Sequence, residues 1–317
     1  MRAGGAGDGG AGDGGDVVVG GDVVVGMDAG GTKLAVRAET IAGDRVVDTA
    51  FAARGWEASP ADAAAGWLVA HLERCLPAGC RVVAAGVGAQ GCDSPRTCED
   101  LRRALGASGI RAVVVNDGAL LVPAAGLERG IGIVAGTGSI GVGSSASGEV
   151  LLTGGWGWVL GDEGGAAAIV REATKAALAA RDDGRPDDGL LAALQAAFGV
   201  GTAQALARAV NDEPTVENWG PRAPAVFAAA DAGSALARRV IDAAAAHLSA
   251  LVGRLVGRGA AGTTVVAAGS VIVQQALLAD ALRARLSVDH PGLELRVLTE
   301  APVAGAVALA RRLLGTP

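Results

Sequence analysis

Two glycine-rich loops, each set between short runs of β-branched residues, constrain the fold of this chain more than any other feature. Asp28 to Lys33 (DAGGTK) follows a run of valines, and Gly136 to Ser139 (GTGS) follows Ile131 to Ala135. Each predicts a hairpin whose tip aims backbone N–H groups at an anion. A hairpin turn without a ligand would explain either loop alone. The pair, roughly a hundred residues apart, is more specific and indicates duplicated domains that grip one nucleotide.

Predicted strands and helices alternate around these loops, which indicates an α/β fold. Arg81 to Val87 and Arg111 to Val115 are predicted strands, and Glu99 to Leu105 is a predicted helix between them. Ser59 is expected to cap an earlier helix that opens at Pro60. We therefore expect a sheet with helices packed on it around each glycine-rich loop.

The chain is long enough, at 317 residues, for two domains with separate cores. Residues 1–20 are rich in Gly and Asp and predict a disordered tail. We place an N-terminal domain over residues 21–122 and a C-terminal domain over residues 123–317. The terminal helix, which Pro302 opens, is expected to pack back on the N-terminal domain.

Gly154 to Gly165 reads GGWGWVLGDEGG and is the most unusual stretch of the chain. Glycine lets a backbone come close to a ligand and tolerates positive φ. A plain glycine-rich turn before a helix near Ala166 would explain some of these glycines. It would not explain the Trp-x-Trp pattern or the acidic pair Asp162 and Glu163, so we interpret the stretch as part of a ligand site.

Two aspartates are candidates for chemistry. Asp117 follows a predicted strand, and open α/β sheets place ligands at the carboxyl ends of their strands, so it is a catalytic candidate. Its alternative role is the N-cap of a helix over Ala119 to Ala125, which Asp performs well. Asp28, in the first loop, can hold a hydrated cation beside the Thr32 hydroxyl.

Composition narrows the possible partners. The formal net charge is −6 and no long run of Lys and Arg occurs, which argues against a nucleic acid or a membrane surface as partner. No apolar run reaches the ~18 residues of a membrane span, so we expect a cytoplasmic protein. The four cysteines, which match no zinc signature, are interpreted as buried or idle thiols. They are Cys75, Cys80, Cys92 and Cys98.

Taken together, the motifs resemble the N-acetylglucosamine kinase branch of the BadF/BadG/BcrA/BcrD ATPase family, within the actin-like sugar kinase superfamily. The resemblance covers nearly everything from Val23 to Leu314, and GGWGWVLGDEGG is its most specific part. The matching motifs are DAGGTK (28–33), VVNDG (114–118), GTGS (136–139), GGWGWVLGDEGG (154–165), AAGSV (267–271) and EAPVAGA (300–306).

The resemblance implies two actin-like (ribonuclease H-like) domains with a nucleotide and sugar cleft between them, and a kinase that uses ATP and Mg²⁺. By this resemblance Asp117 is the base facing the sugar hydroxyl, and Asp28 is the metal residue. The implied nucleotide contacts are Gly30, Gly31, Thr32, Lys33, Gly136, Thr137, Gly138, Gly269 and Ser270. The implied sugar contacts are Asn116, Asp117, Ser139, Gly155, Trp156, Gly157 and Asp162. We also expect a homodimer.

Two departures from the family pattern leave the sugar open. An Asn-containing segment of these kinases corresponds here to Ala53 to Trp56, which has no Asn, and Ile140 stands where an Asn commonly follows the second loop. Phosphorylation of the 6-hydroxyl of N-acetylglucosamine is the leading function, and glucosamine or N-acetylmuramic acid is the alternative sugar. An ATPase that activates a redox partner would need Cys92 and Cys98 to hold an iron–sulfur cluster. The sequence around these two cysteines is unsuitable for that role. A sugar-responsive protein without catalysis is disfavoured by Asp28, Asp117 and both loops.

Overall fold

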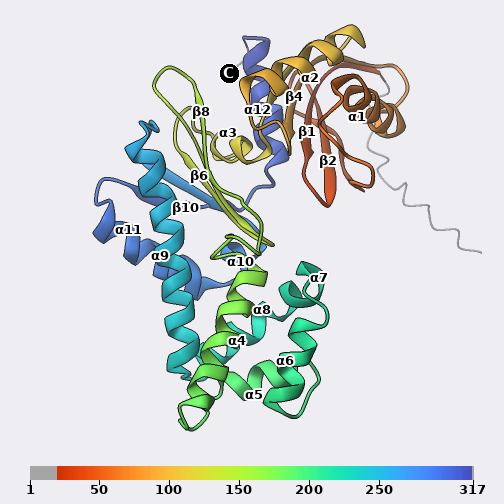
Figure 1. Cartoon of the computed structure of the whole chain (residues 1–317). Helices are drawn as coiled ribbons and strands as arrows, with labels where there is room; N and C mark the ends of the chain where they lie inside the picture. The colour runs from red at the N-terminus through yellow and green to blue at the C-terminus, as the bar shows by residue number, and fades with distance from the viewer. Residues whose placement is uncertain (1–19, 316–317) are drawn as a thin grey trace, which may run out of the picture.

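A computed structural model describes residues 20–315, and these residues form two five-stranded sheets (Figure 1). Sheet A contains β1 (Gly21–Ala29), β2 (Lys33–Thr40), β3 (Arg45–Ala52), β4 (Cys80–Ala89) and β5 (Ala112–Val115). Sheet B contains β6 (Ile131–Ala135), β7 (Ser139–Ser144), β8 (Val150–Gly154), β9 (Thr264–Ala268) and β10 (Glu294–Val297). The tail expected over residues 1–20 lies outside the described residues, apart from Gly20.

The two sheets repeat one topology. Sheet A has the order β3-β2-β1-β4-β5, and sheet B, taken from its other edge, has the order β8-β7-β6-β9-β10. In both sheets the first three strands of the chain pair antiparallel, and the last two run parallel to the first. The predicted duplication is therefore confirmed, and the two glycine-rich loops occupy equivalent hairpin tips, β1–β2 and β6–β7.

The alternation of side chains along β1 explains how sheet A is covered on both faces. Val23, Val25 and Met27 belong to one core cluster with α1 (Ala61–Cys75) and α2 (Pro95–Ala107). Val24, between them, belongs to a second cluster with Val307 and Ala310 of the terminal helix α12 (Val303–Leu313). Because both faces are buried, β1 reads as a continuous apolar run.

Sheet B is covered in the same way. Its Ile131 and Ile133 pack in the large core that includes α9 (Ala235–Gly257), whereas Val266 packs on the opposite face against Leu121 of α3 (Leu121–Ala124). The expected boundary between residues 122 and 123 falls inside α3, and it stays a prediction. The 3₁₀-helix η1 (Asp117–Leu120) connects β5 to α3.

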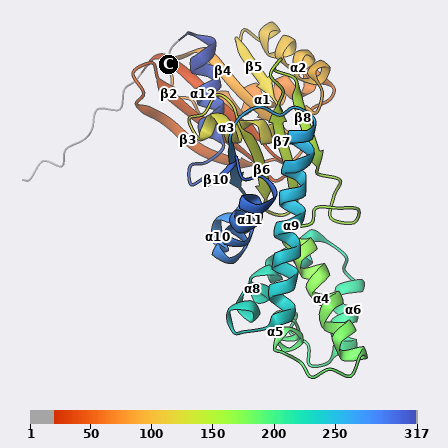
Figure 2. The same ribbon diagram turned by 90° about the vertical axis from the view of Figure 1, so that its left-hand side faces the viewer.

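A helical part extends below sheet B in Figures 1 and 2. Its helices are α4 (Ala166–Asp182), α5 (Leu190–Ala197), α6 (Ala203–Asn211), α7 (Val216–Trp219), η2 (Gly220–Arg222) and α8 (Ala223–Asp231). The helices α10 (Ser270–Gln274) and α11 (Ala276–Asp289) follow β9. Of the helices in residues 20–315, α9 alone is long and apolar enough to cross a membrane, but half of that stretch is buried and contributes to the core.

Several local predictions need correction. Helix α1 begins at Ala61 with Pro60 as its N-cap residue and no side-chain cap, so Ser59 does not cap it. The stretch 212–224, expected as a plain connector, contains α7 and η2. The edge strands β3 and β8 were not predicted. In β3 the burial alternates along polar and apolar residues, so no continuous apolar run marks it.

Candidate active site

Three aspartates meet at one edge of sheet A. Asp28 lies near the end of β1, Asp93 follows β4 and Asp117 follows β5. The carboxyl ends of these strands share an edge because β1, β4 and β5 run parallel. Burial and the nearby Asp117 carboxylate raise the pKa of Asp28 to about 7, against the lowering effect of Lys33. The carboxylates of Asp28 and Asp117 therefore interact electrostatically across this edge.

Asn116 holds Asp117 in place. Its Nδ2 donates a hydrogen bond of 2.8 Å to Asp93 Oδ1, and its Oδ1 accepts one of 2.9 Å from the Gly118 N–H. Asn116, not Asp117, is thus the N-cap residue of η1. Asp117 Oδ1 also accepts from the Gly118 N–H, at 3.0 Å. Since Asn116 is buried and its amide is occupied by these partners, it is placed to position Asp117, and a direct sugar contact stays a prediction.

Asp117 is suited to accept a proton. Burial raises its pKa above the ordinary range, with a further raising effect from Asp93, while the Gly118 N–H lowers it. A carboxylate with a raised pKa is a stronger base than an exposed one. The helix-cap explanation of Asp117 loses its main support because the neighbouring Asn116 performs that role.

Replacing Asp28 by Asn is expected to stabilise the ligand-free protein at pH 8 and to change little at pH 4. The folded pKa of Asp28, about 7, lies above the ~3.9 of an unfolded Asp. The folded state therefore holds this proton more tightly, so stability falls as the pH rises from about 4 to about 7 and is constant above. Thermal melts of both forms across this range check the sign. A lower melting temperature of the variant at pH 8 would contradict it.

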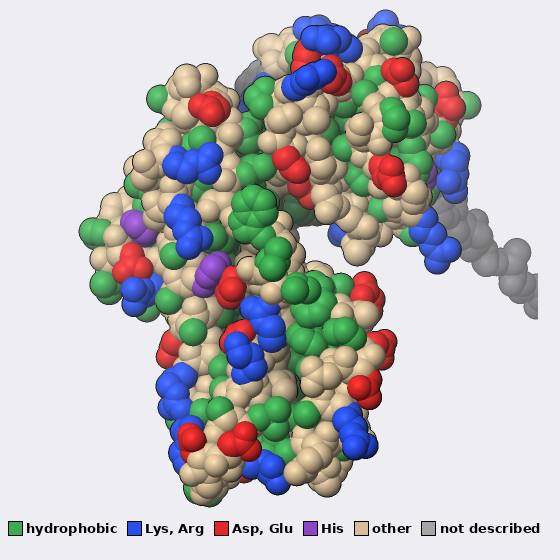
Figure 3. Space-filling view, viewed as in Figure 1, with side chains coloured by type: hydrophobic (Ala, Val, Ile, Leu, Met, Phe, Trp, Pro, Cys, Tyr) green, Lys and Arg blue, Asp and Glu red, His purple; other side chains and the backbone are tan. Residues whose placement is uncertain are grey.

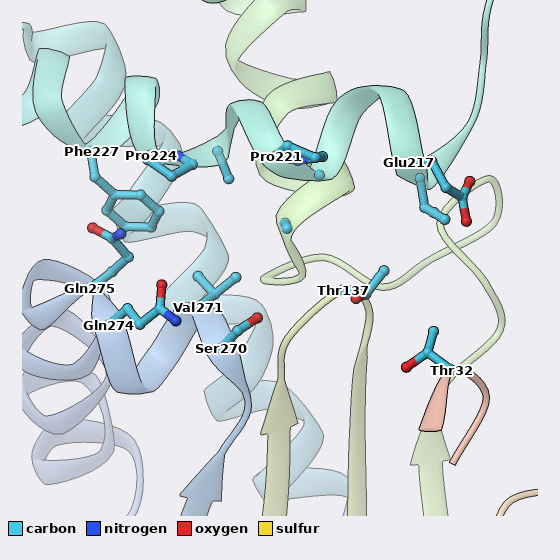
Figure 4. Close-up of a pocket in the computed structure, with 14 residues that line it drawn as sticks. Thr32, Thr137, Glu217, Pro221, Pro224, Phe227, Ser270, Val271, Gln274 and Gln275 are labelled. Atoms are coloured by element: carbon cyan, nitrogen blue, oxygen red, sulfur yellow. The ribbon is translucent and has the colours of Figure 1, made fainter. Parts of the chain in front are cut away.

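A cavity of about 430 Å³ lies between the two hairpin tips and the helical part (Figure 4). Thr32 of the first loop, Thr137 of the second and Ser270 after β9 all line it. Three of the predicted nucleotide contacts, far apart in the sequence, are thus brought to one cavity. The threonines lie toward one end in Figure 4, and a wall of Phe227, Pro224 and Val271 lies toward the other. This cavity offers hydroxyls for phosphates and an apolar wall for a base.

Sequence reasoning missed part of this wall. Phe227 of α8 and Glu217 of α7 come from the helical part, and Gln274 and Gln275 follow β9. None of them lies in a glycine-rich motif, and only the tertiary fold brings them to the cavity. Gln274 and Gln275 form no side-chain hydrogen bond within residues 20–315, so their amides are available to a ligand.

Close packing explains Gly138 of the second loop and two glycines, Gly165 and Gly269, that lie against this loop and the end of β6. A Cβ on Gly165 would lie 2.7 Å from Gly138 Cα, and one on Gly138 would overlap the Asp162 carboxylate. Gly269 has φ +110, and a Cβ there would lie 2.5 Å from the Ala135 carbonyl oxygen. The backbone segments approach so closely that only glycine fits. The loop can therefore present its N–H groups to a ligand without side chains between.

Asp162 lies against the second loop, where its carboxylate occupies the space that a Cβ on Gly138 would need. It is the non-glycine residue with positive φ, 58°, in the part of the chain described, and the backbone amides of Gly157 and Ser139 act on its carboxylate. Burial, the larger effect, raises its pKa, and among the described residues Oδ1 is buried without a hydrogen-bond partner. Such an orphaned acceptor is suited to a hydroxyl or N–H from a ligand. The sugar contact of Asp162 stays a prediction.

The other residues of the GGWGWVLGDEGG stretch, and Ser139 before it, differ in whether they are exposed or packed in the interior. Gly155, Trp156 and Gly157 are exposed, and Trp156 is 76% exposed. Trp158, two positions on, packs into the core and stacks edge-on against Trp219 with ring centroids 4.8 Å apart. Ser139 is buried, and its hydroxyl donates a 2.9 Å hydrogen bond to the Glu163 carbonyl, so its first role is structural.

Trp156→Ala is expected to raise the KM for sugar about tenfold while leaving the KM for ATP nearly unchanged. An exposed indole in a glycine-rich stretch can pack on a sugar face, and Trp156 does not line the cavity that Thr32 and Thr137 share. The matched control is Trp158→Ala, which removes the contact with Trp219 and should lower the melting temperature instead. Initial-rate kinetics and thermal melts separate the two. Equal effects on both substrates would place Trp156 in the fold rather than the sugar site.

The acidic edge is also a candidate place for a cation. Among residues 20–315 no three His, Cys, Asp or Glu side chains are grouped as a complete metal site. Mg²⁺ with a nucleotide needs only one or two protein carboxylates, because phosphates and water supply its other ligands. Asp28 fits this requirement: it is buried enough to have a pKa of about 7, and a bound cation would favour its ionised form.

The site residues do not all meet in one cavity. Thr32, Thr137 and Ser270 line the cavity of Figure 4, whereas Asp28, Asp117 and Trp156 do not. The space-filling view is hollowed between the upper part, which contains sheet A, and the lower helical part (Figure 3).

Duplicated sheets with paired glycine-rich loops define a two-domain fold of the actin-like type. The chain belongs to the BadF/BadG/BcrA/BcrD ATPase family, whose family model matches residues 25–310. The predicted two-domain actin-like α/β fold is confirmed by two solved structures. One is a candidate N-acetylglucosamine kinase from Chromobacterium violaceum (24% identity, TM-score 0.66, covering 91% of this chain and 98% of that chain). The other is a ROK family glucokinase from Streptomyces griseus solved with glucose and AMPPNP (18%, 0.54, 92% and 98%).

A curated relative matches a shorter region. An N-acetylmuramic acid/N-acetylglucosamine kinase from Clostridium acetobutylicum is 39% identical over 106 residues, which are 32% of this chain and 34% of the relative. The match thus spans about a third of the length of that relative. Its name guides the choice of sugar tested below.

Proposed function

We propose that this protein is an ATP-dependent kinase that phosphorylates the 6-hydroxyl of an amino sugar, with N-acetylglucosamine as the first candidate. The observation that carries the proposal is Asp117, a half-buried carboxylate positioned by Asn116 at the edge of sheet A that also bears the first glycine-rich loop. Membership of an ATPase family and the names of the similar proteins support it.

Asp117 and the two loops have separate tasks in this proposal. The backbone around Gly30 and Gly138 holds the phosphates, with Thr32 and Thr137 at the same cavity. Asp117 orients the sugar hydroxyl and takes its proton as the bond to phosphorus forms. Asp28 would hold Mg²⁺, which neutralises phosphate charge when bound. Phosphoryl transfer depends on positioning and electrostatics more than on covalent help, so this set is sufficient.

Glucosamine and N-acetylmuramic acid are the alternative sugars, the second being named for the Clostridium acetobutylicum relative. A cluster-bearing ATPase that activates a redox partner is disfavoured. Cys92 is buried in the core cluster of sheet A, and Cys98 packs against that cluster, so the pair is not presented at a subunit boundary. A cytoplasmic location and a homodimer remain parts of the proposal.

Release of ADP over a panel of sugars tests the proposal. N-acetylglucosamine should give the highest kcat/KM among N-acetylglucosamine, glucosamine, N-acetylmuramic acid, N-acetylmannosamine and glucose. Asp117→Asn, run in parallel, should lower sugar-dependent release by about 10²-fold or more, and release equal to that of the wild type would reveal a contaminating kinase. If no sugar stimulates ADP release by the purified protein, the proposed function is wrong.

A further inference from the structure

Two cysteines flank the aspartate that holds Asn116. Cys92 ends the turn after β4, and Cys98 lies in the first turn of α2, so that Asp93 stands between them in sequence. Cys92 is 1% exposed, and Cys98 is half-buried. The Cys98 thiol donates a 3.4 Å hydrogen bond to the Cys92 carbonyl oxygen. Both side chains meet in the core cluster of sheet A.

The start of α2 explains why these cysteines meet. Ser94 is the N-cap residue, and Ser94 and Thr97 form a reciprocal capping box, which fixes the first turn. Side chains just before a cap and on the fourth helical residue commonly pack together across such a turn. Cys98 is the fourth helical residue, and Cys92 lies two residues before the cap, next to the usual partner position, which Asp93 occupies. The interaction between the two thiols raises the pKa of Cys92 and lowers that of Cys98.

We propose that Cys92 and Cys98 form a reversible disulfide that disturbs the Asp93–Asn116 contact and so switches off the proposed active site. Cys98 is the attacking thiol, because it is the more exposed of the pair and lies in the first turn of a helix. Cys92 is the resolving thiol. The effect on catalysis rests on the proposed kinase function, whereas the disulfide does not.

The chemistry needs only a peroxide as oxidant. The Cys98 thiolate attacks one peroxide oxygen, the O–O bond breaks, and Cys98 becomes a sulfenic acid while the other oxygen leaves as water after protonation. The Cys92 sulfur then attacks the Cys98 sulfur and displaces its hydroxyl, which leaves as water with the Cys92 proton. In sum, two thiols and one hydrogen peroxide give one disulfide and two waters.

A disulfide between Cys92 and Cys98 would change how firmly Asp117 is positioned. A sulfur–sulfur bond is about 2.05 Å long, shorter than any contact between two sulfur atoms that are not bonded, so its formation draws Cys92 toward α2. Asp93 follows Cys92 directly, and it is the partner of Asn116 Nδ2 at 2.8 Å. Asn116 in turn accepts the Gly118 N–H beside Asp117. Displacing Asp93 therefore loosens the group that holds Asp117.

The test treats the full-length protein with hydrogen peroxide and uses three readouts. Mass spectrometry without reductant should find the peptides of Cys92 and Cys98 linked, with two hydrogens lost. Hydrogen exchange of the peptide over residues 112–120 should increase. Sugar-dependent ADP release should fall about tenfold or more and recover with dithiothreitol, since small misplacements at a catalytic group have such effects.

Cys98→Ser should abolish the linkage and the activity loss, and Cys75→Ser is the matched control, because Cys75 is also half-buried but lies at the end of α1. The proposal is overturned if Cys92 and Cys98 stay reduced while Cys75 or Cys80 is oxidised, or if the disulfide leaves exchange over residues 112–120 unchanged. A reduced protein without sugar-dependent ADP release would instead refute the kinase function, and the mass and exchange readouts would still decide the disulfide.

Discussion

Replacing Asp117 by Asn should lower kcat by about 10²-fold or more, the effect typical of removing a general base. The amide keeps the shape of the carboxylate and can still accept the Gly118 N–H, but it cannot take a proton from the sugar hydroxyl. ATP affinity should change by less than about tenfold, because the phosphate loops and the cavity between them do not include Asp117. Steady-state kinetics with both substrates varied measures the two effects.

A thermal melt separates this effect from a loss of folding. Asn116 is the N-cap residue of η1, so Asp117→Asn keeps the cap. The free energy of unfolding of the variant should therefore lie within about 1 kcal/mol of the wild-type value, which is the usual effect of losing a cap. Asp280→Asn is the matched control, since Asp280 is exposed and its partner is Arg283 on its own helix. A normal melt with near wild-type kcat would remove Asp117 from the mechanism.

Gly86→Ala should destabilise the fold by about 3 kcal/mol, the upper end of the usual range for overpacking. A Cβ on this residue of β4 would overlap the carbonyl oxygen of Ala306 and lie 3.1 Å from the Ala310 backbone nitrogen. Those atoms are backbone, so no rotamer change relieves the clash, and α12 must move off sheet A. Urea unfolding with the midpoint and slope compared to the wild type measures the change.

Gly66→Ala is the control for this prediction. Gly66 lies in α1, and no atom lies within 4 Å of an added Cβ. The same substitution should there stabilise the protein by about 0.5–1 kcal/mol, because Ala is the better helix residue. A Gly86→Ala protein as stable as the wild type would mean that α12 does not press on sheet A in solution.

Much of the fold could be predicted from local signals. Both glycine-rich hairpins and the predicted strand at Arg81 to Val87 appear where expected, since buried parallel strands and glycine turns leave strong local patterns. The helix expected from Ala166 begins at that residue. The edge strand β3 left no such pattern, because an edge strand with one exposed face mixes polar and apolar residues.

The site could be predicted only where its residues stand in a motif. Asp28, Asp117 and both loops are marked by glycine and by the ends of strands. Phe227 of α8 and Gln275, between α10 and α11, line the cavity with the two threonines, and their local sequence has no feature of a ligand site. Both Asn116 and Asp117 accept the Gly118 N–H, and Asn116 is the cap because its backbone is extended while Asp117 already lies inside η1. Only the three-dimensional arrangement decides this.

The identity and stoichiometry of the products test the central claim most directly. The purified protein is incubated with ATP, Mg²⁺ and N-acetylglucosamine, and the mixture is followed by ³¹P and ¹H nuclear magnetic resonance. We expect one sugar 6-phosphate for each ADP, with the phosphate on the 6-oxygen. ADP and free inorganic phosphate with unchanged sugar would show an ATPase that does not transfer phosphate to sugar, and would contradict the account.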